Sequence, residues 1–305
     1  MRVLLTGSTG FLGRNLIKAL NSDGITTIAP VRKKIMNSTC FIKYSEFKDF
    51  FDMALDGDIF KDIDVFIHSA ALAHSKNLTK DLYQKVNHEL SITLAKAAAK
   101  SNVKRFIFIS SIGVNGVSNN KPYHNEDMPN PTEDYAISKY NAEIGLKKVA
   151  EDTGMEIVII RPPLVYGKGA PGNFGTLLKV AEKNLPLPLG AINNQRSFVA
   201  IDNLVDLILT CIKHPNAANQ TFLVNDDENI STSNFLKKLT LAAGKKPWLL
   251  PVPVPFLKLI ASIVGKKSVV EKFSSSLTID IEHTKNTLDW SPPVTLDEGI
   301  RRCFK

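Results

Sequence analysis

Short apolar runs alternate with longer segments of helical spacing through the first two thirds of the chain. The runs cover residues 2–6, 25–31, 40–44, 65–71 and 105–111. A strand that helices cover on both faces is apolar along its whole length rather than at alternate positions. The order of runs and helical segments therefore predicts an α/β protein built on a doubly wound parallel sheet.

Three glycines separate the first apolar run from the helical segment at 14–20. Gly7, Gly10 and Gly13 are spaced three residues apart. Glycines at this place make a tight turn, let the backbone approach a pyrophosphate and allow close packing of helix on strand, while the helix N-terminus faces the anion. The pattern predicts a dinucleotide site, and a turn without a ligand is the alternative.

The end of the second run bears on the choice of cofactor. Sites that prefer NAD usually have an acidic residue there, about 20 residues past the glycines. Here Arg32 and Lys33 follow Val31. A guanidinium can pair with a 2′-phosphate, and Lys33 would assist it. We therefore expect NADP, with NAD as the other candidate and a solvated basic loop as the alternative.

Small and polar residues end the run at 65–71. Ser69, Ala70 and Ala71 leave room for a bound cofactor at the end of a strand. We interpret His68 as a packed histidine rather than a catalyst. The amphipathic helix expected at 82–99 contains one further polar candidate, Asn87.

Tyr135 and Lys139 are four residues apart in a segment of helical spacing, so they lie one turn apart on one helix face. An ammonium beside a phenol favours the phenolate, and we expect it to lower the pKa of Tyr135 from its ordinary value near 10. Tyr135 would then move a proton on or off a carbinol or carbonyl. Ser111, at the end of the run at 105–111, would orient the same oxygen. Two surface residues on an amphipathic helix are the alternative.

Composition and charge narrow the class of ligand. The chain has 305 residues, of which 44% are hydrophobic, and a formal net charge of +8. This charge favours phosphorylated small molecules, since no nucleic-acid motif is present. Three scattered cysteines, Cys40, Cys211 and Cys303, fit a reducing compartment and no metal spacing. No apolar run reaches the roughly 18 residues of a membrane span, and the first run leaves no room for a signal peptide. We expect a cytoplasmic protein.

Five motifs follow one another in an order typical of one family. They are Gly7-x-x-Gly10-x-x-Gly13, His68-Ser69-Ala70-Ala71, Asn87, Ser110-Ser111 and Tyr135-x-x-x-Lys139. Together they resemble the extended short-chain dehydrogenase/reductase family, and within it the nucleotide-sugar enzymes similar to UDP-glucose 4-epimerase. Segments at 161–167, 195–204 and 288–292 resemble the same group. The resemblance implies a Rossmann sheet with a smaller, discontinuous C-terminal substrate domain.

The resemblance also implies roles for individual residues. Ser111, Tyr135 and Lys139 would be the catalytic residues. The cofactor would contact Gly7, Gly10, Phe11, Leu12, Gly13, Arg32, Ser69, Ala70, Ala71, Asn87, Tyr135 and Lys139. The UDP-sugar would contact Ser111, Asn173, Pro188 and Arg196. Arg196 suits a phosphate by its own geometry as well. No metal is implied.

Departures from the family patterns select the reaction. Ile112 and Gly113 stand where 4,6-dehydratases of the family have an acidic pair, and where enzymes acting at C3 and C5 have a cysteine. What remains is hydride transfer at one carbon or 4-epimerisation. Because epimerases of the family have an acidic residue in place of Arg32 and many have Asn in place of Pro163, we interpret the chain as a 4-keto sugar reductase of surface-polysaccharide precursor synthesis.

Three other functions stay open. The first is a 4-epimerase of a UDP-hexose or UDP-N-acetylhexosamine. The second is reduction of an alcohol or ketone without a nucleotide. The third is a nonenzymatic NADP-binding protein, which the presence of Ser111, Tyr135 and Lys139 argues against.

The composition shifts after Gly167, where loops rich in Gly, Asn and Pro begin. We expect a cofactor domain at 1–167 with about 196–225, and a substrate domain at 168–195 with about 226–305. Residues 157–166, 202–213 and 221–225 would return to the first sheet. The apolar segment 256–264, with Lys266 and Lys267 after it, is interpreted as a core helix of the substrate domain, and a membrane-surface helix is the alternative. The family implies a homodimer.

Overall fold

The larger lobe is a seven-stranded parallel sheet. The structure is a computed structural model that describes residues 1–32, 41–46, 49–73, 78–263, 265 and 267–305. Its strands are β1 (Arg2–Thr6), β2 (Thr26–Val31), β3 (Ile42–Glu46), β4 (Val65–His68), β5 (Arg105–Ile109), β6 (Glu156–Arg161) and β9 (Thr221–Leu223). They lie in the order β3-β2-β1-β4-β5-β6-β9, and every pairing is parallel. The strand order reverses between β1 and β4, where sheets of this kind bind ligands.

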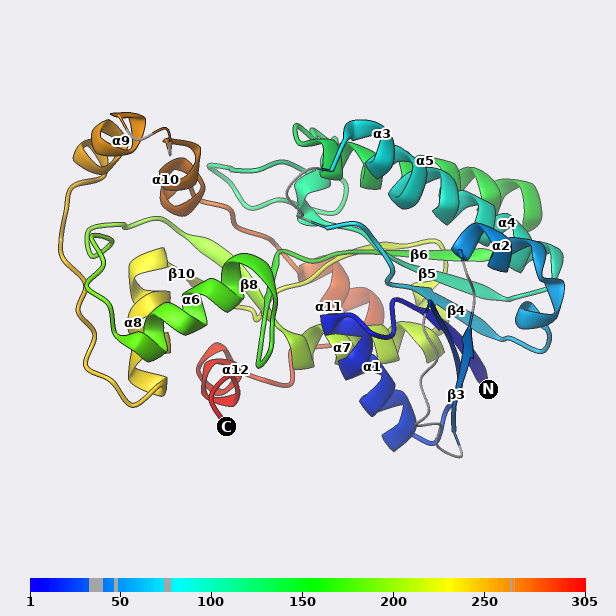
Figure 1. Cartoon of the computed structure of the whole chain (residues 1–305). Coiled ribbons are helices and arrows are strands. Elements are labelled where there is room, and N and C mark those ends of the chain that lie inside the picture. Colours follow the sequence, from blue (N-terminus) through cyan, green and yellow to red (C-terminus); the bar gives the residue numbers. More distant parts are fainter. Residues whose placement is uncertain (33–40, 47–48, 74–77, 264, 266) are drawn as a thin grey trace.

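Helices cover both faces of this sheet (Figure 1). One face carries α1 (Phe11–Ser22), α7 (Ile201–Lys213) and α11 (Glu282–Leu288), and their core includes Leu16, Leu204 and Ile208. The other face carries α2 (Phe50–Leu55), the 3-10 turn η1 (Gly57–Phe60), α3 (Lys80–Tyr83), α4 (Leu90–Lys100) and α5 (Asp134–Thr153). Strands buried on both sides explain why the runs in the sequence are apolar throughout.

A π-helical segment, η2 (Gln84–Glu89), joins α3 to α4, so that residues 80–100 form one continuous helix. The amphipathic helix expected at 82–99 is confirmed, with this change of hydrogen-bond register near its start. The helix expected around Tyr135 is confirmed as α5, which ends at Gly154 in the left-handed conformation (φ 75°). Glycine adopts this conformation without the penalty that a Cβ atom brings.

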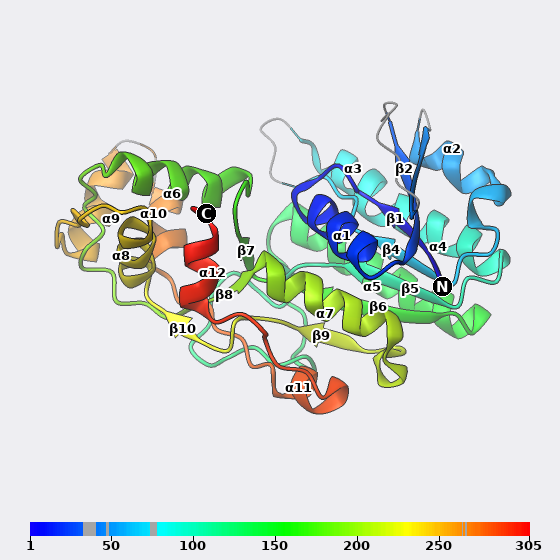
Figure 2. The ribbon, with the colours of Figure 1, turned by 90° about the horizontal axis from the view of Figure 1, so that it is seen from below.

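A smaller second lobe packs beside the carboxyl ends of these strands (Figure 2). Its sheet has the order β10-β8-β7, with β7 (Leu164–Tyr166), β8 (Arg196–Ala200) and β10 (Asn229–Ile230). Its helices are α6 (Gly172–Lys183), α8 (Thr232–Ala242), α9 (Val254–Ile263), α10 (Lys267–Ser274) and α12 (Leu296–Arg302). Its core stacks Phe198 on Phe235 at 4.1 Å between ring centroids.

The expectation that residues 157–166 all return to the first sheet is wrong in part. β6 pairs with β5 and β9 in the seven-stranded sheet, whereas β7 pairs with β8 in the three-stranded sheet. Pro162 and Pro163 separate the two strands, and a proline cannot continue a ladder of backbone hydrogen bonds. The helix at 202–213 and the strand at 221–225 do lie on the first sheet, as α7 and β9. The division into domains stays a prediction.

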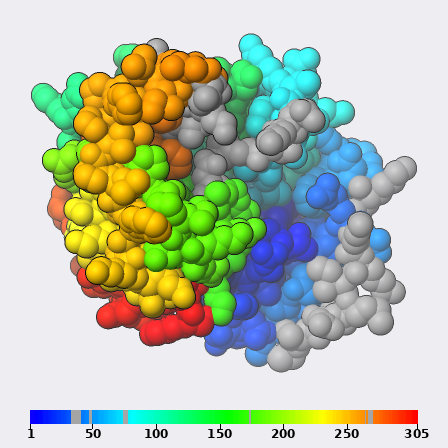
Figure 3. Space-filling view, turned by 60° about the vertical axis from the view of Figure 1, so that its left-hand side comes forward, coloured from blue at the N-terminus to red at the C-terminus, as the bar shows by residue number. Residues whose placement is uncertain are grey.

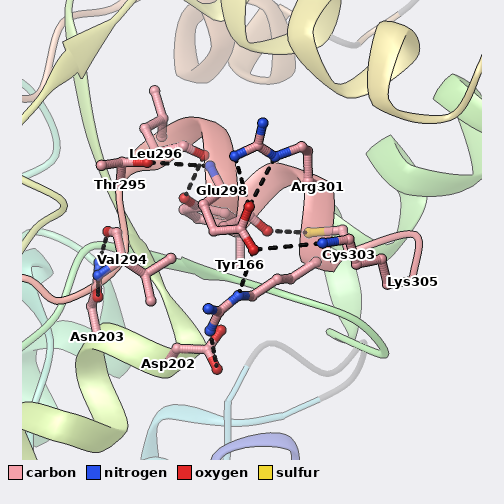
Figure 4. A network of polar contacts seen from close by, with 12 residues as sticks. Tyr166, Asp202, Asn203, Val294, Thr295, Leu296, Glu298, Arg301, Cys303 and Lys305 are labelled. Carbon is pink, nitrogen blue, oxygen red and sulfur yellow. Dashed lines mark hydrogen bonds and ion pairs between the residues drawn. The ribbon is translucent and has the colours of Figure 1, made fainter.

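The C-terminal segment is fastened to the rest of the chain by polar side chains (Figure 4). The amide of Asn203 on α7 makes two hydrogen bonds with the backbone of Val294, at 2.7 and 2.9 Å. Tyr166, fully buried at the end of β7, donates to Asp226 at 2.6 Å and to the carbonyl of Leu296 at 3.3 Å. Burial and the Asp226 charge raise the pKa of Tyr166, and burial raises the pKa of Asp226 to about 6. These bonds fasten the start of α12 to α7 and to the end of β7.

Candidate active site

The glycine turn is built for close backbone contacts. Gly7 has φ +76°, and a Cβ atom there would lie 2.6 Å from the backbone nitrogen of Ala70. A Cβ atom on Gly13 would lie 2.0 Å from the carbonyl oxygen of Gly7. Gly10 donates to that same carbonyl at 2.9 Å and begins α1. No side chain fits at Gly7 or Gly13, which leaves the backbone and the helix N-terminus open to an anion.

Two partly buried residues open α1. Phe11 and Leu12 pack against the core under the first sheet, and Phe11 also contacts the core of the second lobe. The ring of Phe11 would lie 3.3 Å from a Cβ atom on Gly167. The turn that carries the glycines is therefore held between the two lobes.

The end of β4 meets the glycine turn. Ser69 donates to the carbonyl of Thr6 at 2.7 Å, and Ala70 and Ala71 follow as small, partly or fully exposed residues. His68 is fully buried, with Nδ1 2.7 Å from Thr6 Oγ1 and Nε2 3.0 Å from Ser91 Oγ. Burial lowers the pKa of His68 to about 3, and the charge of Lys139 acts in the same direction. The interpretation of His68 as a packed histidine is confirmed by its complete burial.

The side chain of Asn87 joins two segments of the protein. Its Oδ1 accepts from the backbone of Leu72 at 2.8 Å, and its Nδ2 donates to the carbonyl of Leu72 at 3.0 Å and to Ser138 Oγ at 3.1 Å. Asn87 lies in the π-helical segment, a feature that often accompanies functional sites. These bonds fix the position of the backbone just after Ala71. Asn87 therefore supports the segment that lines the proposed cofactor site.

Ser111, Tyr135 and Lys139 gather at the carboxyl end of β5. Ser111 follows β5, and its Oγ accepts from the backbone of Gly113 at 3.1 Å. A Cβ atom on Gly113 would lie 3.2 Å from that of Ala136, so this turn packs on the first turn of α5 beside Tyr135. Lys139, 1% exposed, donates from Nζ to the carbonyl of Ile109 at 2.8 Å. The structure thus brings Ser111 to the same end of the sheet as the helix turn that carries Tyr135 and Lys139.

Burial, rather than the lysine, dominates the titration of these groups. It raises the pKa of Tyr135 to about 12, and Tyr83, whose ring meets that of Tyr135 edge-on at 6.1 Å, acts in the same direction. The expectation that Lys139 lowers this pKa is wrong for the protein without ligands. Burial also lowers the pKa of Lys139 to about 7, while the charge of Glu143 opposes that shift. The ammonium lies over the ring of Phe108, 4.4 Å from its centroid.

A buried polar network lies behind this site. Glu143, one turn beyond Lys139 on α5, accepts from Ser110 Oγ at 2.5 Å and from Arg161 Nη2 at 2.5 Å. Arg161 also donates to Asn115 Oδ1 at 2.9 Å. The pairing of Glu143 with Arg161 was not predicted from the sequence. The features that could have indicated it are a carboxylate one turn past Lys139 and an arginine inside an apolar run.

The candidates for the outer parts of the site are more scattered. Arg32 is exposed directly after β2, at the carboxyl edge of the sheet, and its proposed helper Lys33 lies outside the described residues. Asn173 is the second residue of α6, and Pro188 is exposed in the loop between α6 and β8. Their contacts with a ligand remain predictions.

Arg196 lies at the start of β8 with its guanidinium turned into the protein. Its Nη1 donates to the carbonyl of Lys272 at 2.7 Å and to that of Ser275 at 3.1 Å. Within the described part of the chain, no carboxylate lies within ion-pair distance of Arg196. Burial lowers its pKa. A half-buried cation without an acidic partner is suited to an anionic ligand.

The described residues contain no group of three or more His, Cys, Asp or Glu side chains arranged to hold a metal ion. None of their helices is long and apolar enough to cross a membrane.

Comparison with known proteins identifies the family. The model of the NAD dependent epimerase/dehydratase family matches residues 3–225. The chain belongs to that family. It is 44% identical to a UDP-glucose 4-epimerase of Vibrio cholerae, over 98% of this chain and 93% of the relative. The similarity to the extended short-chain dehydrogenase/reductase enzymes, inferred from the sequence, is confirmed, and the protein is an enzyme of this type.

Solved structures show the same fold. The UDP-glucose 4-epimerase of Thermotoga maritima, solved with UDP-glucose, matches 100% of this chain and 97% of its own with a TM-score of 0.78 at 22% identity. The UDP-glucuronic acid 4-epimerase of Bacillus cereus, solved with NAD, matches 100% of this chain and 95% of its own with a TM-score of 0.82 at 20% identity. The predicted doubly wound α/β fold is confirmed.

Proposed function

We propose that this enzyme interconverts the C4 epimers of a UDP-linked hexose. The observation that carries the proposal is that Ser111 and Lys139 lie at the end of β5, where the first turn of α5, which carries Tyr135, packs against the turn after Ser111. The residue after Ser111 is Ile112, buried and apolar. Epimerisation at C4 takes a proton from one oxygen and returns it to that oxygen, so one acid/base suffices.

The glycine turn fits a nicotinamide dinucleotide. A Cβ atom at Gly7 or Gly13 would clash with neighbouring backbone atoms, so the turn carries no side chain at these positions. The N-terminus of α1 lies at this turn. Gly7, Gly10 and Gly13 would hold the pyrophosphate, with Ser69, Ala70 and Ala71 alongside. A bound nicotinamide supplies the hydride acceptor and donor that oxidation and reduction at C4 require.

The protein's own residues handle the proton and the charge. Tyr135 would act as the phenolate, taking the proton from the C4 hydroxyl during oxidation and returning it to the same oxygen during reduction, so it must first lose the proton that burial makes it hold near neutral pH. Ser111 would hydrogen-bond the same oxygen. The ammonium of Lys139 would stabilise the phenolate that Tyr135 forms in between.

The substrate class rests on Arg196 and on the relatives. A half-buried guanidinium without a carboxylate partner would bind a diphosphate, and Asn173, in the first turn of α6, and Pro188, in the loop after α6, belong to the segments expected around the nucleotide. The Vibrio cholerae relative is named for UDP-glucose, and the Thermotoga maritima structure was solved with it. These findings support a UDP-sugar.

The comparisons favour the epimerase over the 4-keto sugar reductase with which the sequence analysis led. The relative at 44% identity is a 4-epimerase, and so are the two solved structures described above. One observation keeps the reductase as the second candidate. Arg32 is exposed at the end of β2, where an acidic residue would favour NAD over NADP.

A product assay with a small amount of cofactor separates the two reactions. The purified enzyme is incubated with UDP-glucose or UDP-N-acetylglucosamine and NAD at one hundredth of the sugar concentration, and the anomeric protons are followed by NMR. An epimerase converts many sugars per cofactor to the galacto epimer, with no net change in absorbance at 340 nm. A reductase leaves these sugars unchanged and instead consumes NADPH one for one with a UDP-4-keto-6-deoxy sugar.

Arg32→Asp serves as the matched variant for cofactor choice. If Arg32 binds a 2′-phosphate, the variant should lose at least tenfold in affinity for NADPH and little for NADH. Equal affinities in both proteins would make Arg32 a solvated loop residue. The homodimer and the cytoplasmic location stay predictions, and size-exclusion chromatography with light scattering would test the dimer.

A further inference from the structure

A row of apolar side chains faces away from the protein on α9. Phe256, Leu259, Ile260 and Ile263 occupy positions i, i+3, i+4 and i+7 of this helix, which place them on one face. We call these four residues the α9 stripe. Each is between 45% and 80% exposed. Apolar residues that gather on an exposed surface mark an interaction site, whereas single exposed ones do not.

The opposite face of α9 holds the helix to the second lobe. Leu257 and Ala261, one turn apart, are 7% and 5% exposed. The helix thus has two apolar faces, and only one of them is covered by the protein. The sequence analysis interpreted this segment as a core helix, which describes Leu257 and Ala261 but not the α9 stripe.

The chain around α9 is uniformly basic. Residues 241–270 contain no Asp or Glu, and their charged residues are Lys245, Lys246, Lys258, Lys266 and Lys267. Lys245 and Lys246 are exposed, and within the described residues neither they nor Lys258 form an ion pair. Trp248, 57% exposed, is two residues beyond Lys246. In Figure 3 the orange residues of this region form a continuous rim on the second lobe.

We infer that this rim docks on an anionic membrane surface. A short helix with an apolar stripe, in a stretch of chain whose charged residues are all lysines, is the combination that lies in the interface of a bilayer. The lysines attract anionic headgroups, and the stripe enters the headgroup region. The helix docks on the membrane and does not cross it, since it has only 10 residues.

A second copy of the chain fits this rim less well. A two-fold interface pairs a patch with itself, so Lys258 and the other lysines of this segment would be brought towards the same lysines of the partner. Like charges at close range oppose such a contact, whereas an anionic lipid surface complements them.

A membrane surface docked at this rim would lie close to the candidate active site. The helix next to α9 is α10, and its Lys272 pairs with Glu133 at 2.6 Å, directly before α5. The carbonyl of Lys272 also accepts from Arg196, the proposed diphosphate ligand. The docked enzyme would therefore work with its second lobe, including the region around Arg196, next to the membrane.

Vesicle binding by the whole enzyme tests this inference. Trp248 is a built-in probe, because the other tryptophan, Trp290, is buried with its Nε1 bonded to Asp206. With vesicles of phosphatidylcholine and phosphatidylglycerol at three to one, Trp248 emission should shift to shorter wavelength and the enzyme should co-sediment. With pure phosphatidylcholine, or in 0.5 M salt, binding should fall at least fivefold.

Matched variants locate the contact. Leu259→Gln with Ile263→Gln removes half of the α9 stripe and should lower co-sedimentation at least tenfold. Leu55→Gln with Met128→Gln removes two residues that are 86% and 89% exposed elsewhere, and it should bind like the wild type. Lys245→Gln with Lys246→Gln should weaken binding and reduce its salt dependence. Each variant is first matched to the wild type in melting temperature.

Three results would overturn the inference. The first is that the wild type binds neither kind of vesicle. The second is that the stripe variant binds as tightly as the control pair. The third is that sedimentation velocity shows two copies held together through the α9 stripe, with the stripe variant monomeric and vesicle binding absent.

Discussion

The guanidinium of Arg161 and the carboxylate of Glu143 form a two-point ion pair inside the protein. Nε lies 3.0 Å from Oε1, and Nη2 lies 2.5 Å from Oε2. Both side chains are at most 3% exposed. Glu143 stands one turn beyond Lys139 on α5, and its charge opposes the effect of burial on the lysine's pKa. The pair therefore joins β6 to the helix that carries the candidate catalytic residues.

Glu143→Gln should destabilise the protein strongly. Removal of the carboxylate charge leaves the Arg161 guanidinium buried without compensation, at a cost of about 3–5 kcal/mol in the free energy of unfolding. Urea unfolding followed by circular dichroism measures it. The control is Lys148→Gln, which removes an exposed lysine that pairs with Asp152 on the same helix and should leave the unfolding midpoint unchanged. Equal midpoints for the two variants would show that the buried pair is not needed for stability.

Tyr135→Phe should remove turnover and spare cofactor binding. The phenol is the only acid/base proposed at the reacting oxygen, and such groups contribute about 10²–10⁴-fold to rate. Steady-state kinetics and a cofactor titration measure the two quantities. Tyr83→Phe, which keeps the ring that packs edge-on against Tyr135, is the control and should retain at least a tenth of the activity. Activity above a few per cent in Tyr135→Phe would contradict the assignment of Tyr135.

Gly13→Ala should weaken cofactor binding at least tenfold and lower the melting temperature. The new Cβ atom would lie 2.0 Å from the carbonyl of Gly7 and 2.6 Å from the Cα atom of Ser8, so the turn must shift. Fluorescence titration with NADH and with NADPH measures the affinity. Gly57→Ala adds the same atom where no other atom lies within 4 Å, and it should behave as wild type. If both variants bind cofactor alike, the close packing of the glycine turn is irrelevant to binding.

The buried histidine should make the protein sensitive to acid. His68 has a pKa of about 3 in the folded protein and 6.5 as its ordinary value. Above pH 6.5 both states are neutral, and as the pH falls from 6.5 towards 3 only the unfolded state gains the proton. Stability is therefore lost over this range, by about 2 kcal/mol between pH 6.0 and 4.5 from this residue alone.

His68→Asn removes that titration, whatever its effect at neutral pH. Urea unfolding of both proteins at pH 6.0 and 4.5 should show a smaller loss of stability in the variant. His124→Asn, at an exposed position, should keep the slope of the wild type. The same slope in wild type and His68→Asn would show that His68 is accessible to protons in the folded protein.

Local pattern was enough to determine the sheet and its first helix. The apolar runs predicted β1, β2, β4 and β5 because a strand covered on both faces leaves a continuous hydrophobic signal. The glycine spacing at Gly7 and Gly13 predicted the turn because close backbone approach excludes a Cβ atom whatever the rest of the fold. The spacing of Tyr135 and Lys139 placed both on one helix. These are short-range properties that a sequence records directly.

Contacts between distant segments decided the rest. Whether Lys139 lowers the pKa of Tyr135 depends on how deeply both are buried, and burial dominates. The pairing of Glu143 with Arg161, and of β7 with β8 instead of β6, follows from how layers pack and not from neighbours along the chain. The exposure of the α9 stripe likewise depends on which face of α9 the second lobe covers. A sequence shows that such a helix is apolar, and only the tertiary structure shows which side of it meets water.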